Sequence, residues 1–109
     1  MPLVRLGQLA YARSGDKGSG ANIGVIARSP ADYVRLRAFL TAERVQDYFA
    51  SMGVGPVIRY ELPNLHAFNF LLPKILDGGG SVSLRIDAQG KALGQVLLEM
   101  ELDLPEGQP

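Results

Sequence analysis

A helix start at Ser29 and Pro30, between two strand-like runs, most restricts the folds open to this chain. Ser29 can cap a helix, Pro30 suits the first helical position, and Asp32 lies three residues after the cap. Before it, residues 23–27 are nearly all apolar, as is typical of a central strand covered on both faces. After it, residues 57–62 alternate between apolar and polar side chains. These signals predict a strand, a helical crossover and a second strand.

The crossover is expected in two helical pieces. Tyr33, Leu36 and Leu40 recur at helical spacing, and Thr41 resembles a second cap. Beyond this cap, four apolar residues follow one helix face: Val45, Tyr48, Phe49 and Met52. The spacing therefore predicts a break near Thr41.

Alternating side chains predict further strands at residues 3–12, 57–62, 81–87 and 98–104. In the second of these, we expect the apolar side chains to point inward and the charged ones outward. The inward set is Ile58, Tyr60 and Leu62, and the outward set is Arg59 and Glu61.

Residues 65–72 are apolar on nearly every side and lie between Pro63 and Pro73. With Asn64 as a cap, they predict a short helix that must be buried in the core or against another chain. A second helix is expected after Asp87, carrying three apolar residues, Leu93, Val96 and Leu97.

From residue 22 onward the expected order is strand, helix, strand, strand, helix, strand. This order predicts an α+β fold, a ferredoxin-like split βαβ sandwich, with an extra N-terminal strand and a short apolar helix between the third and fourth strands. Residues 1–109 are expected to form one domain, with a frayed tail at 105–109. In this fold, strand 3–12 is expected at an outer edge, not as a simple hairpin with strand 22–28, unless the strand order differs.

Composition narrows the classes of function. Eleven Lys and Arg residues balance eleven Asp and Glu residues, which argues against a nucleic-acid binder and fits self-association. Because cysteine is absent and there is one histidine, disulfides, thiolate nucleophiles and multi-histidine metal sites are excluded within one chain. No apolar run approaches a membrane span and no signal peptide is recognisable, so we expect a cytoplasmic protein.

The segment 13–22 is the densest run of glycine, charge and small polar groups. We interpret it as a long loop whose backbone N–H groups can form an anion nest, with charge from Arg13 and Lys17. It is neither a P-loop nor a dinucleotide fingerprint, because a strand follows it. A connector that contacts a neighbouring subunit is an equally good interpretation.

A second polar cluster surrounds Glu61, Asn64 and Asn69 at the end of a strand. We expect the two clusters to meet if a site exists, and we expect backbone groups to bond the Asn69 amide. Arg85 is interpreted as an ion-pair partner of Glu61 or Asp16, or as an anion ligand. The candidate ligand- or anion-binding residues are Arg13, Ser14, Gly15, Asp16, Lys17, Gly18, Asn22, Glu61, Asn64, Asn69 and Arg85.

Catalytic residues are unknown, and Asp16 and His66 are the candidates for acid/base chemistry. Their spacing, and that of Ser14, does not support a triad, and a packed or interface histidine explains His66 more simply. The acidic row Glu99, Glu101 and Asp103 indicates a solvated strand face instead of a metal site. We expect no metal and no cofactor.

Four segments resemble the small ferredoxin-fold domain of the acyclic terpene utilisation A (AtuA-like) family. They are residues 13–18 (RSGDKG), 21–28 (ANIGVIAR), 61–67 (ELPNLHA) and 84–91 (LRIDAQGK). In that family the domain is fused to a much larger domain or stands alone. The resemblance implies a role in the catabolism of acyclic terpenoids or branched acyl-CoA compounds, with no established reaction for the small domain.

Three functions follow as hypotheses. The first is an accessory subunit that assembles with itself and with a larger AtuA-like protein, through the apolar segment 65–76. The second is a stand-alone hydratase- or lyase-type enzyme acting on an acyl-CoA or carboxylate. The third is a small-molecule anion-binding module.

Overall fold

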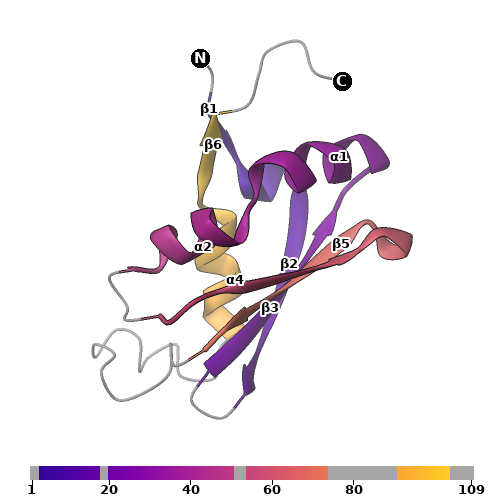
Figure 1. The fold of residues 1–109 in the computed structure, drawn as a ribbon. Helices are drawn as coiled ribbons and strands as arrows, with labels where there is room; N and C mark the ends of the chain where they lie inside the picture. Colours follow the sequence, from indigo (N-terminus) through magenta and orange to yellow (C-terminus); the bar gives the residue numbers. More distant parts are fainter. Residues whose placement is uncertain (1–2, 18–19, 51–53, 74–90, 104–109) are drawn as a thin grey trace.

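The computed structural model describes residues 3–17, 20–50, 54–73 and 91–103 (Figure 1). In chain order its elements are β1 (Leu3–Arg5), the 3₁₀ turn η1 (Leu6–Gln8), β2 (Ala10–Lys17), β3 (Gly20–Ala27), α1 (Pro30–Phe39), α2 (Ala42–Tyr48), β4 (Ile58–Leu62), the 3₁₀ turn η3 (Pro63–Leu65), β5 (Ala67–Leu72), α4 (Lys91–Leu98) and β6 (Glu101–Asp103). Helices combined with antiparallel sheets confirm the predicted α+β class.

Four antiparallel strands form the main sheet in the order β2-β3-β5-β4, and β1 pairs with β6 in a small second sheet. The α1, α2 and α4 helices lie over one face of the main sheet, as Figure 1 shows. Between the helices and this face lies one core, with large buried side chains from both layers, including Ile23, Phe68, Leu36 and Leu93.

The segment predicted as a long polar loop is a β-hairpin. Arg13 pairs with Gly24, and pairing continues without a gap to Lys17 opposite Gly20. The predicted long loop is therefore wrong, and so is the expectation that the N-terminal strand does not form a hairpin with the next one. The expected position at an outer edge is confirmed, because β2 is the first strand of the sheet. An edge strand tolerates polar residues because solvent can reach its outer side. Backbone pairing with β3 outweighs the low strand propensity of glycine and aspartate.

Residues 67–72 form the strand β5, so the predicted short helix is wrong. A short apolar run does not distinguish a strand from a buried helix. Here β5 pairs with both β3 and β4, and it buries Phe68, Phe70 and Leu72 within the chain. Asn64 does not cap a helix; it lies in η3, whose N-cap is Leu62, without a side-chain cap.

The crossover helices agree with their sequence signals. The Ser29 hydroxyl accepts a hydrogen bond from the Asp32 backbone N–H at 3.1 Å, and the Thr41 hydroxyl accepts one from the Arg44 N–H at 3.1 Å. The break between α1 and α2 falls at Leu40 and Thr41, as predicted.

The alternation predicted in β4 is present, but its two faces are exchanged. Ile58, Tyr60 and Leu62 are exposed, whereas Arg59 is half-buried on the helix side. The Arg59 guanidinium donates to the Leu40 carbonyl at 2.9 Å, at the C-terminal end of α1, and this contact requires the helix-facing position.

The last described elements are α4 and β6. Leu93 and Leu97 are buried on α4, and Met100 and Leu102 are buried beside exposed Glu101, which agrees with the predicted alternation. Leu98 belongs to the helix and not to the predicted strand. The strand predicted at 81–87 lies outside the described residues. Within the described ranges, no helix is long and apolar enough to cross a membrane.

Candidate functional site

The face of the main sheet opposite the helices, here called the open face, carries twelve residues in three rows. Strand register places one residue from each of β2, β3, β5 and β4 in every row. The rows are Tyr11, Ile26, Ala67 and Leu62; then Arg13, Gly24, Asn69 and Tyr60; then Gly15, Asn22, Leu71 and Ile58. No helix of the described chain covers this face (Figure 1).

A groove of about 630 Å³ lies on the open face. Small residues on the two central strands, such as Gly24 and Ala67, leave space, while Tyr60, Leu62 and Leu65 form a wall. The residues that line the groove are Asn22, Gly24, Ile26, Tyr60, Leu62, Leu65, Ala67, Phe68 and Asn69.

Two amides lie in this groove. The Asn22 Nδ2 donates to the Asn69 Oδ1 at 3.1 Å, so the partner of Asn69 is a side chain and not the predicted backbone group. The Asn69 NH₂ and the Asn22 Oδ1 make no hydrogen bond to any residue that the structure describes. The same hydrogen bond forms in the opposite direction if the oxygen and nitrogen atoms of both amides are interchanged. In either arrangement the pair presents one NH₂ group and one carbonyl oxygen that are not bonded to each other.

The two polar clusters of the sequence meet through this pair. Arg13 and Gly15 lie on the same open face, in neighbouring rows. A Cβ added at Gly15 would lie 3.4 Å from the Asn22 Oδ1, so glycine here leaves room for the amide.

Other candidate residues lie elsewhere. The Ser14 hydroxyl, on the helix side, accepts a hydrogen bond from the Gly94 backbone N–H at 3.1 Å. Glu61 pairs with Arg59 at 2.8 Å on the helix side, and Asn64 is exposed in η3. The backbones of Asp16 and Lys17 belong to β2, while Gly18 and Arg85 lie outside the described residues.

The acid/base candidates are not brought together. Asp16 is in register with Ala21 and Leu72, whereas His66 lies beyond the opposite end of β5. Six residues along a strand separate these positions by roughly 20 Å. The His66 and Tyr33 rings instead pack in an edge-to-face arrangement, with 5.7 Å between their centroids.

His66 is the one non-glycine residue of the described chain with positive φ, at 51°, and it ends η3. Its role in the described structure is therefore to turn the chain into β5. Within the described ranges, no three acidic or histidine side chains gather in a way that would hold a metal ion.

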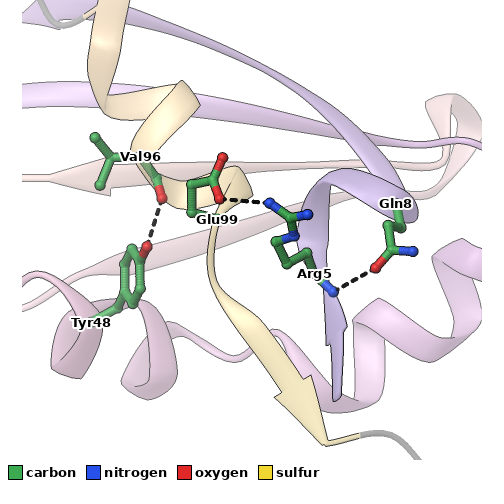
Figure 2. Close-up of polar contacts among 5 residues, drawn as sticks. All are labelled: Arg5, Gln8, Tyr48, Val96 and Glu99. Atoms are coloured by element: carbon green, nitrogen blue, oxygen red, sulfur yellow. Dashed lines mark hydrogen bonds and ion pairs between the residues drawn. The ribbon is translucent and has the colours of Figure 1, made fainter. Parts of the chain in front are cut away.

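A smaller polar groove, of about 280 Å³, lies between η1 and α4. Figure 2 shows its main contacts: the Arg5 guanidinium pairs with Glu99 at 3.0 Å, and the Arg5 backbone N–H donates to the Gln8 Oε1 at 3.0 Å. Nearby, the Tyr48 hydroxyl donates to the Val96 carbonyl at 2.6 Å. Burial, together with the Glu99 charge, raises the pKa of Tyr48 above its usual 10.0. Because Arg5 and Glu99 satisfy each other, we interpret this groove as a structural contact.

Several groove residues were not predicted from the sequence. They are Gly24, Ile26, Tyr60, Leu62, Leu65, Ala67 and Phe68. The alternation in residues 58–62 predicts a strand with two different faces. It does not show whether the even-numbered or the odd-numbered residues face the helices. Recognition of the hairpin at 13–22 would have placed Arg13, Gly24 and Asn22 on known faces.

Comparison with known protein families gives a match over most of the chain. A family model described as the AtuA ferredoxin-like domain matches residues 4–103, which confirms the resemblance and the ferredoxin-like α+β fold. No curated protein and no solved structure matches the chain.

Proposed function

The chain belongs to the AtuA ferredoxin-like domain family, and from this premise we propose that it is a non-catalytic subunit that docks onto a larger AtuA-like chain. The open face is the docking surface. The role of that assembly is the catabolism of acyclic terpenoids or related branched acyl-CoA compounds, as the family resemblance implies.

The observation that carries the proposal is the set of large apolar side chains left exposed on the open face. Tyr11, Ile26, Ile58, Tyr60 and Leu62 are all exposed there, and Leu65 adjoins them. Clustered apolar side chains of this kind mark interaction surfaces. The segment 65–76, predicted as the contact, is replaced by this face because β5 is a central strand of the chain's own sheet.

Charge favours a different chain over a second copy as the partner. Arg13 lies on the open face, and the Arg28 guanidinium lies over the ring of Tyr11, 4.0 Å from its centroid. A symmetric dimer through this face brings the same cationic patch into the interface twice, which like-charge repulsion opposes. A partner with acidic groups around an apolar centre suits this face better.

A pair of matched substitutions tests the docking. Ile58→Asp places a charge on the open face, where Ile58 is 48% exposed, and Val34→Asp places one on α1, where Val34 is 57% exposed. We expect Ile58→Asp to weaken binding to the larger AtuA-like chain at least tenfold, and Val34→Asp to leave it unchanged, in titration calorimetry. Equal affinities for the two variants, or light scattering that shows only self-association, would contradict the proposal.

A further inference from the structure

We infer that the groove on the open face is a binding site for a small apolar carboxylate. The carboxylate lies over Gly24, between Arg13 and Asn69, and the hydrocarbon body lies against Ile26, Leu62 and Leu65. The docking proposal does not require this site, and the isolated chain is sufficient to bind the ligand.

The position of the head group follows from strand register. Arg13, Gly24 and Asn69 lie side by side on three adjacent strands. Adjacent strands are about 4.8 Å apart, so the Arg13 and Asn69 backbones are about 10 Å apart. Gly24 has no side chain between them, and a Cβ built there meets no atom closer than 3.8 Å, the Arg13 carbonyl oxygen. Gly24 thus leaves open space in a groove that Asn69 lines, and the exposed Arg13 lies next to Gly24 on the edge strand, outside the groove lining.

The hydrogen-bond donors next to Gly24 determine which chemical group a ligand must present to them. Arg13 offers a guanidinium, and the Asn69 NH₂ has no partner among the described residues. The hydrogen bond between the Asn22 and Asn69 amides leaves one NH₂ group of the pair available to a ligand, here that of Asn69. Among the residues that the structure describes, no carboxylate lines the groove to compensate a cationic ligand. A guanidinium and an amide N–H together favour a carboxylate over an amine or a neutral hydroxyl.

The side chains that line the groove and the volume of the groove determine the kind of ligand body that fits. Four aliphatic side chains line the groove: Ile26, Leu62, Leu65 and Ala67. Its volume of about 630 Å³ lies in the range of roughly 300–1,000 Å³ usual for small-molecule sites. Such sites commonly lie where two domains or chains meet, which is compatible with a partner docked on the same face.

Calorimetric titration of the isolated chain with octanoate, octanol and octylamine tests the inference. We expect octanoate to bind at one site per chain, at least tenfold more tightly than octanol, with no binding of octylamine. Equal binding of all three probes, or binding at many sites, would overturn the inference, because either result means nonspecific adsorption to apolar surface.

Substitutions in the groove locate the site. Gly24→Val fills the space for the head group, and we expect it to weaken octanoate binding at least tenfold. Gly24→Ala, which adds one methyl group in open space, gives a smaller loss and serves if the valine variant does not fold. Asn69→Leu is expected to remove the preference for octanoate over octanol. Val34→Ala on α1 is the matched control and is expected to bind as the parent chain does.

Octanoate affinity that is unchanged in both Gly24 variants would overturn the location. The octanoate experiment and the docking experiment can fail independently of each other. A parent chain that docks but does not bind octanoate contradicts this inference alone. A parent chain that binds octanoate but does not dock contradicts the docking proposal alone.

Discussion

Arg59 decides, at the scale of a single residue, which side of β4 faces the core. Its guanidinium donates to the carbonyls of Arg37 and Leu40 at 3.0 and 2.9 Å, and it pairs with Glu61 at 2.8 Å. It also lies over the Phe68 ring, 5.1 Å from the centroid. These bonds compensate for partial burial of a charge, so the apolar residues of β4 take the open face.

Tyr48 gives a prediction for high pH. Its pKa is raised in the folded chain by burial and by the Glu99 charge, so the folded state holds the phenolic proton more tightly than the unfolded state. The resulting stability is complete below pH 10 and decreases as the pH rises above 10 through the folded pKa.

Tyr48→Phe is expected to lower the free energy of unfolding at pH 7 by about 1 kcal/mol, because the hydrogen bond to the Val96 carbonyl is lost. Above pH 10 the difference between the two proteins is expected to shrink. Urea denaturation at pH 7 and at several values above pH 10 measures this, with the exposed Tyr60→Phe as control. A difference that is constant or grows with pH would show that Tyr48 does not cause the effect.

At the scale of elements, α4 lies close against β2 because Gly94 faces that strand. A Cβ at Gly94 would lie 3.3 Å from the Ser14 hydroxyl and 3.5 Å from the Ala12 Cβ. The Gly94 N–H also donates to that hydroxyl. Glycine weakens a helix, but here it lets α4 lie close to β2, because a larger residue would crowd Ser14 and Ala12.

Gly94→Val is expected to destabilise the chain by about 1–3 kcal/mol, through overpacking between α4 and β2. The exposed Gln95→Ala, on the same helix, is expected to change the stability by less than about 0.5 kcal/mol. Thermal and urea unfolding of both variants measure the difference. A Gly94→Val variant as stable as the parent would mean that the two elements can separate without cost.

At the scale of the whole molecule, the small sheet joins two distant parts of the chain to the main core. β1 pairs with β6, and the Leu6 N–H donates to the Met100 carbonyl at 2.8 Å. Leu6 and Leu102 are both fully buried in the core cluster. We therefore expect the two sheets to unfold as one cooperative unit.

The substitution Leu102→Ala tests whether the two sheets unfold together. Removing a fully buried leucine side chain is expected to cost about 2–5 kcal/mol, because a cavity replaces its packing contacts. The exposed neighbour Asp103→Ala is expected to have a small effect. Unfolding followed by circular dichroism and by Tyr fluorescence should give one coincident transition. Two separate transitions would show that the small sheet is an independent unit.

The local features of this protein follow from residues that are close together in the chain. The caps at Ser29 and Thr41 are set by hydroxyls and backbone groups three residues apart, and the order of helices in the crossover follows from them. Four short motifs were enough to indicate the family, which the match over residues 4–103 confirms.

Other features depend on contacts between distant segments and could not be predicted before the fold was known. Residues 67–72 are a strand because β3 and β4 pair with them, and residues 13–17 are a strand because they pair with β3. The same pairing places Asn22 against Asn69, 47 positions apart in the chain, and so creates the groove. Local propensity does not contain this information, because backbone pairing and the choice of sheet face are energies of contact between segments far apart in sequence.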